Sequence, residues 1–195
     1  IAVLSIATRP DCLGADVLNM LEALNAVKPV WVELGLQTAN EDTAKAIRRH
    51  YGNEVYLEAV RQLRSRHIEV ITHIILGLPG EALEDALKSV DLAVKAGTTG
   101  VKLQLLHVLR GTELHKQYEA GEFSVLGLDE YITWLFECIR RLPPHIVVHR
   151  ITGDAPKRHL VEPQWSADKK NVLNTINRTA EMQQLFQGSA FSGSL

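Results

Sequence analysis

Five polar side chains interrupt strand-like runs of this sequence, at positions where a structural core would place valine. They are a carboxylate, two amides, an imidazole and an ammonium group, carried by Glu33, Gln37, Gln104, His73 and Lys102. Burying such groups on the inner face of a parallel sheet costs free energy unless they pair with one another or contact a ligand. An internal ion pair between Glu33 and Lys102 is the plainer explanation of two of them. Polar groups from three strands that converge on one mouth are typical of a binding site.

Glycine-rich and polar turns follow these runs and mark where a ligand would bind. The apolar run that holds His73 ends in Gly77-Leu-Pro-Gly80, and an acidic amphipathic segment begins at Glu81. The first run is followed by Thr8-Arg-Pro-Asp11, and the last by Ile151-Thr-Gly-Asp-Ala-Pro156. In α/β proteins ligands bind where strands end and helices begin, so these turns predict the rim of a site.

Strand-like and helix-like runs alternate along the chain. The strands are expected near 1–7, 30–37, 69–76, 101–108 and 146–149. The helices are expected near 16–26, 42–49, 54–66, 81–96, 128–142 and 167–185. Strands that alternate with helices of this length indicate parallel β/α units. We therefore expect an α/β protein with a parallel sheet and outer helices, in the form of an open or half barrel.

The composition is that of a globular protein without a bulk attraction to polyanions. Of the 195 residues, 46% are apolar and 23% are charged, and the formal net charge is −2. That charge gives no overall attraction to nucleic acid or to an anionic membrane. Cys12 and Cys138 lie far apart and form no metal-ligand pair, so we expect two reduced thiols. Without a signal peptide or a membrane-spanning run, the chain is expected in the cytoplasm and away from membranes.

The chain starts inside a strand-like run at Ile1, so we expect a fragment whose preceding strands are missing. We divide it into a truncated barrel over 1–160, a C-terminal helical extension over 161–186 and a disordered tail over 187–195. A barrel without its first strands leaves a strand edge unpaired. Any dimer of this fragment would then be an artefact of truncation.

Five segments, in this order and spacing, resemble the radical S-adenosylmethionine (SAM) enzymes. They are Ser5–Asp11, Glu33–Gln37, His73–Glu81, Leu109–Thr112 and Arg150–Pro156. The resemblance covers nearly the whole chain and is strongest to a bacterial group described as Fe–S oxidoreductases. More distantly, the segments are similar to the radical SAM domain of the Elongator catalytic subunit, which modifies wobble uridine in tRNA. The resemblance implies the C-terminal portion of a partial (β/α)6 barrel, similar to a TIM barrel, with SAM at the carboxyl ends of the strands.

The resemblance also implies a set of cofactor contacts. They are Glu33, Gln37, Arg49, His73 and Gly77. Gln37 stands where the family binds the ribose or amino-acid part of SAM, and His73 stands where it contacts the ribose. Arg49 lies at the spacing of the arginine that holds the SAM carboxylate, with Arg48 as the alternative. Gly77 lets the main chain approach the adenosine, because glycine has no side chain to obstruct it.

One departure from the family is the absence of its C-x-x-x-C-x-x-C motif, whose thiolates hold a [4Fe–4S] cluster. Cys12 stands alone and cannot replace that motif, so the cluster ligands are expected on the missing N-terminal segment. No metal ligand is expected in this chain. The parent protein is expected to be an oxidoreductase in which the cluster, reduced by an electron donor, cleaves SAM to a 5′-deoxyadenosyl radical. The fragment alone is expected to be inactive.

Substrate recognition is assigned to polar residues near the same rim, namely Thr8, Arg9, Asp11, Lys102 and Asp154. By analogy with Elongator, the expected substrate is a tRNA wobble uridine. Basic clusters at 48–50 and 61–67 could contact phosphate, although exposed helix faces often carry such charges without a binding role.

Two other functions stay open at this point. A β/α-barrel enzyme without radical chemistry would bind a phosphate at the helix start near Glu81, where Glu81 and Glu84 make an anion less welcome. A catalytically inactive scaffold would instead bind partners through the open edge of the barrel.

Overall fold

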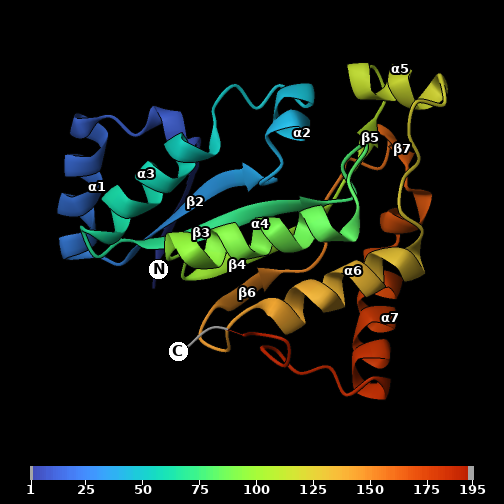
Figure 1. Cartoon of the computed structure of the whole chain (residues 1–195). Coiled ribbons are helices and arrows are strands. Elements are labelled where there is room, and N and C mark those ends of the chain that lie inside the picture. Colours follow the sequence, from blue (N-terminus) through green and yellow to red (C-terminus); the bar gives the residue numbers. More distant parts are fainter. Residues whose placement is uncertain (1, 193–195) are drawn as a thin grey trace.

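The computed structural model describes residues 2–192, and its centre is a parallel sheet of five strands (Figure 1). In spatial order the strands are β1 (Leu4–Thr8), β2 (Val30–Gln37), β3 (Glu69–Leu76), β4 (Gly100–Leu105) and β6 (Val147–Arg150). Each neighbouring pair is parallel, so the five carboxyl ends lie at one edge of the sheet. This confirms the expected α/β class and brings the predicted turns to the same edge.

Five helices share one hydrophobic core with this sheet. They are α1 (Ala15–Val27), α3 (Asn53–Arg64), α4 (Leu83–Ala96), α6 (Leu128–Arg141) and α7 (Lys169–Met182). Figure 1 shows α4 lying along β3, with α6 beside α4. Because strand side chains alternate between faces, Leu34, Leu36 and Ile74 all point to the helices and are fully buried. The apolar alternation within the strands therefore fixes which face the helices cover.

The other face of the sheet carries the polar residues that the sequence singled out. Its half-buried positions include Glu33, Gly35 and Gln37 on β2, His73 on β3, and Lys102 and Gln104 on β4. The pairing of β2 with β3 shifts register between Gly35 and Gln37, which is a bulge at the end of β2. This face is the inner surface expected for a partial barrel.

Shorter elements lie outside the main sheet. They are a 3₁₀ turn (Pro10–Cys12), α2 (Glu41–Ala46), β5 (Val108–Leu109), α5 (Glu113–Glu119), β7 (Leu160–Glu162) and a second 3₁₀ turn (Gln164–Ala167). β5 and β7 pair in the antiparallel sense, and α7 packs on α6. No helix within residues 2–192 is long and apolar enough to cross a membrane.

Two expected elements end earlier than the sequence predicted. The helix expected over 42–49 stops at Ala46, because Arg48 and His50 adopt left-handed backbones with φ of 57° and 67°. The strand expected over 101–108 stops at Leu105, and the separate strand β5 turns away to pair with β7.

The tail expected to be disordered is described as far as residue 192. Within it, the Gln187 side chain donates hydrogen bonds to the main-chain oxygens of Pro143 and Ile146 at 2.8 and 2.7 Å. Residues 193–195 lie outside the described part of the chain.

Candidate functional site

A hydrogen-bonded cluster on the inner face joins four strands. The Glu33 carboxylate on β2 accepts hydrogen bonds from Ser5 Oγ of β1 at 2.7 Å and from Lys102 Nζ of β4 at 2.5 Å. His73 Nε2 on β3 lies 2.8 Å from the same carboxylate. Gln104 Nε2 lies 3.1 Å from the other ring nitrogen of His73. The structure thus brings together three predicted site residues, and they contact one another.

The cluster determines the charge of its members. Burial opposes the ionisation of Glu33, but hydrogen bonds, led by that from Lys102, outweigh it and lower the pKa of Glu33 to about 2. Burial lowers the pKa of His73, and the nearby Glu33 carboxylate offsets this only in part. A neutral His73 therefore donates from Nε2 to Glu33 and accepts at Nδ1 from Gln104. The internal ion pair between Glu33 and Lys102 is present, with both side chains largely buried.

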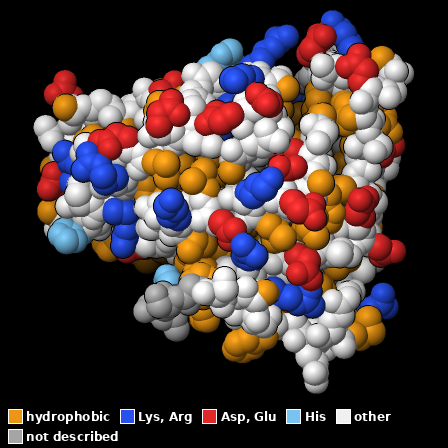
Figure 2. All heavy atoms as spheres, in the orientation of Figure 1, with side chains coloured by type: hydrophobic (Ala, Val, Ile, Leu, Met, Phe, Trp, Pro, Cys, Tyr) orange, Lys and Arg blue, Asp and Glu red, His pale blue; other side chains and the backbone are white. Residues whose placement is uncertain are grey.

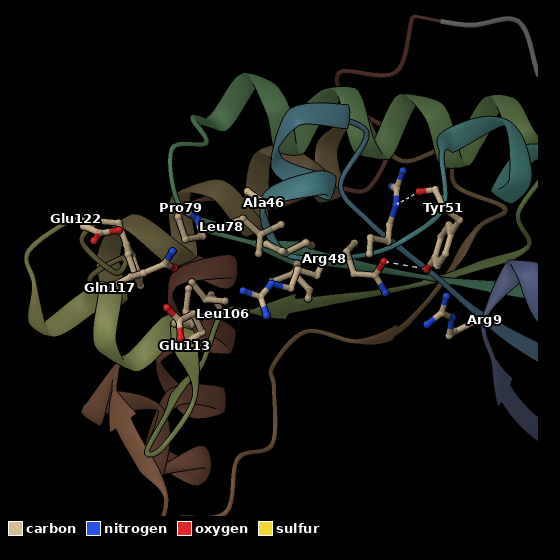
Figure 3. A pocket seen from close by; sticks show the side chains of 16 residues that line it. Arg9, Ala46, Arg48, Tyr51, Leu78, Pro79, Leu106, Glu113, Gln117 and Glu122 are labelled. Carbon is tan, nitrogen blue, oxygen red and sulfur yellow. Dashed lines mark hydrogen bonds between the residues drawn. The ribbon is translucent and has the colours of Figure 1, made fainter.

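A cavity of about 570 Å³ opens at the carboxyl edge of the sheet. Its apolar lining includes Ile75, Leu78, Pro79, Leu106 and Phe123. Figure 3 shows Arg9 and Tyr51 towards one end of the cavity and Glu113, Gln117 and Glu122 towards the other, with Arg48 between them. A cavity of this size, mainly apolar with a few polar groups, suits a small organic ligand.

Gln37, predicted as a cofactor contact, lies at the end of β2 and lines this cavity. Its Oε1 accepts a hydrogen bond from the Tyr51 hydroxyl at 3.2 Å. Its Nε2 has no hydrogen-bond partner among residues 2–192 and therefore offers two N–H donors. The sequence did not single out Tyr51, because a lone tyrosine in a loop carries no signal of its own.

Arg49, the predicted partner of a carboxylate, is committed to the protein. Its side chain is 2% exposed, and Nη1 donates to the main-chain oxygens of Leu36 and Thr38 at 2.9 and 2.8 Å. Nε donates to the main-chain oxygen of Tyr51 at 2.8 Å, and Nη2 lies 3.3 Å from Glu41. The Arg49 guanidinium thus holds the loop after α2 against the end of β2.

Arg48 lies beside Arg49 in sequence and differs from it in every contact. It is exposed, lines the cavity and forms no side-chain hydrogen bond or ion pair with any described residue. The backbone of Arg48 is left-handed, with φ of 57°. The Arg48 side chain is exposed, whereas that of Arg49 is buried. Arg48 is therefore the free guanidinium of the cavity.

The turn from Gly77 to Gly80 borders the cavity at the end of β3, where Leu78 and Pro79 supply lining. Gly77 has a φ of 79°, and a Cβ at that position would come within 2.8 Å of the Leu126 side chain. The Thr38 hydroxyl donates to the Glu81 carboxylate and ties this turn to the end of β2. Burial raises the pKa of Glu81, although the Thr38 hydrogen bond opposes the rise.

The residues assigned to substrate recognition do not form one group. Among the described residues, only Arg9 of the five lines the cavity, and its guanidinium makes a bidentate contact with Asp11 at 2.9 and 2.6 Å. Lys102 is engaged by Glu33, and Asp154 pairs with Lys169 at 2.6 Å. The hydroxyl of the fifth residue, Thr8, lies 3.5 Å from the main-chain oxygen of Arg9.

The side chains of residues 2–192 do not fit an iron–sulfur cluster. Within residues 2–192, no group of three His, Cys, Asp or Glu side chains could hold a metal ion. Cys12 is exposed and alone, and burial raises the pKa of the Cys138 thiol to about 12, which keeps it protonated.

The helix start after Gly80 is not arranged for a phosphate. The main-chain N–H of Ala82, the N-cap residue of α4, is taken by the Asp85 carboxylate at 3.2 Å. Glu84 adds a second carboxylate in the first turn of α4. Negative charge at this position repels an anion, so nothing in this helix start favours the phosphate-binding alternative.

Comparison with known proteins places the sequence. Residues 1–93 match the radical SAM superfamily, and residues 98–182 match the Radical_SAM C-terminal domain. The protein YtqA of Bacillus subtilis is 42% identical over 96% of this chain, and the chain spans 58% of the length of YtqA. A tRNA uridine(34) acetyltransferase of Methanocaldococcus infernus is 27% identical over 93% of this chain, which spans 34% of that protein.

A solved structure supports the fold. The archaeal Elp3 of Methanocaldococcus infernus, with residues 1–46 deleted, superimposes with a TM-score of 0.80 over 95% of this chain and 43% of its own. The two sequences are 24% identical, so this likeness speaks for the fold alone. It agrees with the partial barrel expected from the sequence. With two family matches that together cover most of its length, the chain belongs to the radical SAM superfamily.

Proposed function

We propose that this chain binds SAM in the cavity at the carboxyl edge of its sheet, as the cofactor-binding part of a radical SAM enzyme. The proposal is carried by two groups that line the same cavity of about 570 Å³ without a partner among the described residues. They are Nε2 of Gln37 and the guanidinium of Arg48. SAM offers ribose hydroxyls and a carboxylate that such groups bind, and an adenine that apolar side chains cover.

Different residues would contact different parts of SAM. Arg48 would pair with the carboxylate, and Gln37 would donate to a ribose or carboxylate oxygen through Nε2. Ile75, Leu78 and Leu106 would pack against the adenine and exclude water from the site. In this proposal Arg49 acts indirectly, because its donors already bind main-chain oxygens.

The cluster around Glu33 would stabilise the strands that carry the site. Glu33, His73 and Lys102 lie on the inner face of the strands whose ends form the cavity, and they satisfy one another. We propose that they hold β2, β3 and β4 in register and present a polar barrel interior to a substrate. Gly77 would contribute by letting the main chain of the turn approach the adenosine.

The chemistry of the whole protein follows from the cofactor. SAM bound here would supply radical hydrogen-abstraction chemistry once an external reductant provides one electron, while the residues of this chain would orient it and exclude water. Because the residues described here do not fit a [4Fe–4S] cluster, we propose that the cluster ligands and the electron donor lie outside this chain. The chain spans 58% of YtqA, which leaves room for them.

For the substrate of the whole protein we propose a tRNA uridine. A relative named as a tRNA uridine(34) acetyltransferase supports this choice. The basic residues of 61–67 do not, because Arg61, Arg64 and Arg66 pair with glutamates at 2.5, 3.5 and 3.3 Å. Figure 2 shows basic and acidic side chains interspersed on the viewed face. We also propose a cytoplasmic location, in keeping with two free cysteines.

Isothermal titration of the 195-residue chain with SAM tests the cofactor site. Gln37→Ala and Arg48→Leu should each weaken binding about tenfold or more, as the loss of one ligand hydrogen bond or ion pair predicts. Arg61→Leu on α3, whose guanidinium pairs with Glu58, is the matched control and should leave the affinity unchanged. Absence of SAM binding, or equal loss in all three variants, would overturn the proposal.

A second experiment tests the activity. The whole protein, purified without oxygen and shown to hold its cluster, is incubated with SAM and a strong reductant, and 5′-deoxyadenosine is measured. We expect reductant-dependent product that falls in Gln37→Ala. No product from a cluster-loaded protein would exclude the radical mechanism and leave the binding scaffold as the function.

A further inference from the structure

The backbone at Gln37 is held in an unusual conformation. Its φ is 60°, a left-handed value that is costly for a residue with a side chain, and it forms the end of the bulge in β2. Strain of this kind persists only where the surroundings enforce it, and it gathers at binding and catalytic sites. Two neighbours, Gly35 and Tyr51, contact this residue.

Gly35 leaves room for the Gln37 amide. A Cβ at Gly35 would overlap Nε2 of Gln37 and would lie 3.1 Å from the hydroxyl oxygen of Tyr51. The amide therefore folds back over Gly35, into space that any other residue would fill. The bulge, the glycine and the left-handed backbone all serve to place one side-chain amide.

Tyr51, from the loop between α2 and α3, holds the other side of that amide. Its single hydroxyl proton is shared between two acceptors, the main-chain oxygen of Gly35 at 2.8 Å and Oε1 of Gln37 at 3.2 Å. Its ring lies near two guanidinium groups, 5.0 Å from that of Arg49 and 5.5 Å from that of Arg9. These contacts fix the ring, so the hydroxyl has a defined position. Figure 3 shows the hydrogen bond from Tyr51 at the wall of the cavity.

We infer that Tyr51 is a positioning residue for the cofactor site, which orients the Gln37 amide so that its N–H donors serve the ligand. With Oε1 occupied by Tyr51, the free Nε2 selects a hydrogen-bond acceptor, such as a hydroxyl or carboxylate oxygen, and rejects a donor. The inference rests on the proposed SAM site. It assigns to Tyr51 the role of fixing which end of the Gln37 amide, the N–H donors or the oxygen, faces the ligand.

A double-mutant cycle on SAM affinity tests this assignment. The variants are Tyr51→Phe, Gln37→Ala and the double variant, titrated with SAM in the 195-residue chain. Tyr51→Phe keeps the ring near the two guanidinium groups and removes only the hydroxyl. It should weaken SAM binding about tenfold in the unaltered background and have little further effect when Gln37 is alanine.

A second tyrosine provides the control. Tyr56→Phe removes a buried hydroxyl that contacts Thr72 at 2.7 Å on the helix-covered side of β3. It should lower the melting temperature without changing SAM affinity. If Tyr51→Phe also lowers only the melting temperature, or if its effect adds fully to that of Gln37→Ala, Tyr51 has no positioning role.

A readout without ligand separates this inference from the SAM proposal. The side-chain NH₂ of Gln37, followed by ¹⁵N relaxation, should be rigid in the unaltered chain and mobile in Tyr51→Phe, while other glutamine amides are unchanged. Rigidity that survives Tyr51→Phe overturns the inference even if SAM binds. Absence of SAM binding with the expected change in mobility overturns the ligand and leaves the positioning of Gln37 by Tyr51 in place.

Discussion

The ammonium group of Lys102 on β4 lies 2.5 Å from the carboxylate of Glu33 on β2, although β3 runs between these two strands. Glu33 lies opposite Ile71 of β3, and Lys102 lies opposite His73. The lysine therefore reaches across the inner face, over the intervening strand. His73 fills the gap and contacts the same carboxylate.

The ion pair predicts a loss of stability in acid. The pKa of Glu33, lowered to about 2, lies below its ordinary value of 4.5, so its contribution is complete above pH 4.5 and is lost as the pH falls towards 2. Lys102→Met should cost about 1–3 kcal/mol at neutral pH and flatten this acid limb. Urea unfolding at pH 7 and pH 3 measures both effects. Lys95→Met, an exposed change on α4, is the control, and an unchanged acid limb in Lys102→Met would contradict the assignment.

Glu81 predicts the opposite pH dependence. Burial raises its pKa, so the folded state favours the protonated form and loses stability as the pH rises through and above the ordinary glutamate value. Glu81→Gln keeps an oxygen for the Thr38 hydroxyl and removes the buried charge. Its stability relative to the unaltered chain should rise between pH 4 and pH 8 in urea unfolding. The same substitution at the exposed Glu122 should show no such trend. If the stability of Glu81→Gln relative to the unaltered chain fell between pH 4 and pH 8, the interpretation would be refuted.

Two glycines of one turn give a matched pair. Gly77 and Gly80 share a φ of 79°, but a Cβ would meet Leu126 only at Gly77, whereas no atom lies within 4 Å at Gly80. Gly80→Ala should cost the backbone strain alone, about 1–2 kcal/mol, and Gly77→Ala about 1–3 kcal/mol more from overpacking. Chemical denaturation of both variants provides the comparison. Equal losses would show that Leu126 moves aside freely.

The neighbouring arginines should separate stability from ligand binding. Arg49→Leu leaves the main-chain oxygens of Leu36, Thr38 and Tyr51 without their donor and should destabilise the fold by about 3–5 kcal/mol. Arg48→Leu removes no hydrogen bond of the described chain and should leave the unfolding midpoint within error. Thermal unfolding and SAM titration of both variants test the contrast. A destabilised Arg48→Leu would show that its guanidinium has a structural role.

Much of the framework could be predicted from the sequence. The runs 30–37 and 69–76 coincide with β2 and β3, because β-branched and apolar residues there are bounded by turn residues. The strand pair of β5 and β7 was missed, since two very short strands far apart in the chain carry no periodic signal. The helix end before Arg48 was missed because left-handed residues other than glycine leave no mark in composition.

The site was predictable in its residues and less so in their partners. Alternation placed Glu33, His73 and Lys102 on one face, as the structure shows. Which of them would contact each other depends on the register of three strands, which the sequence alone does not define. The role of Tyr51 depends on a loop conformation that brings it to Gln37, and no spacing rule anticipates that contact.

The Glu33 cluster has a consequence for how the sheet opens. One carboxylate on β2 is bonded to side chains of β1, β3 and β4. Parting β1 or β3 from β2 therefore breaks a charged contact as well as the backbone ladder, and parting β4 from β3 breaks the ion pair with Glu33 as well as their ladder. Local fluctuations that free a single strand are thereby penalised, and the four strands should exchange their amide hydrogens as one cooperative unit. We therefore expect the polar inner face to strengthen the cooperativity of the sheet.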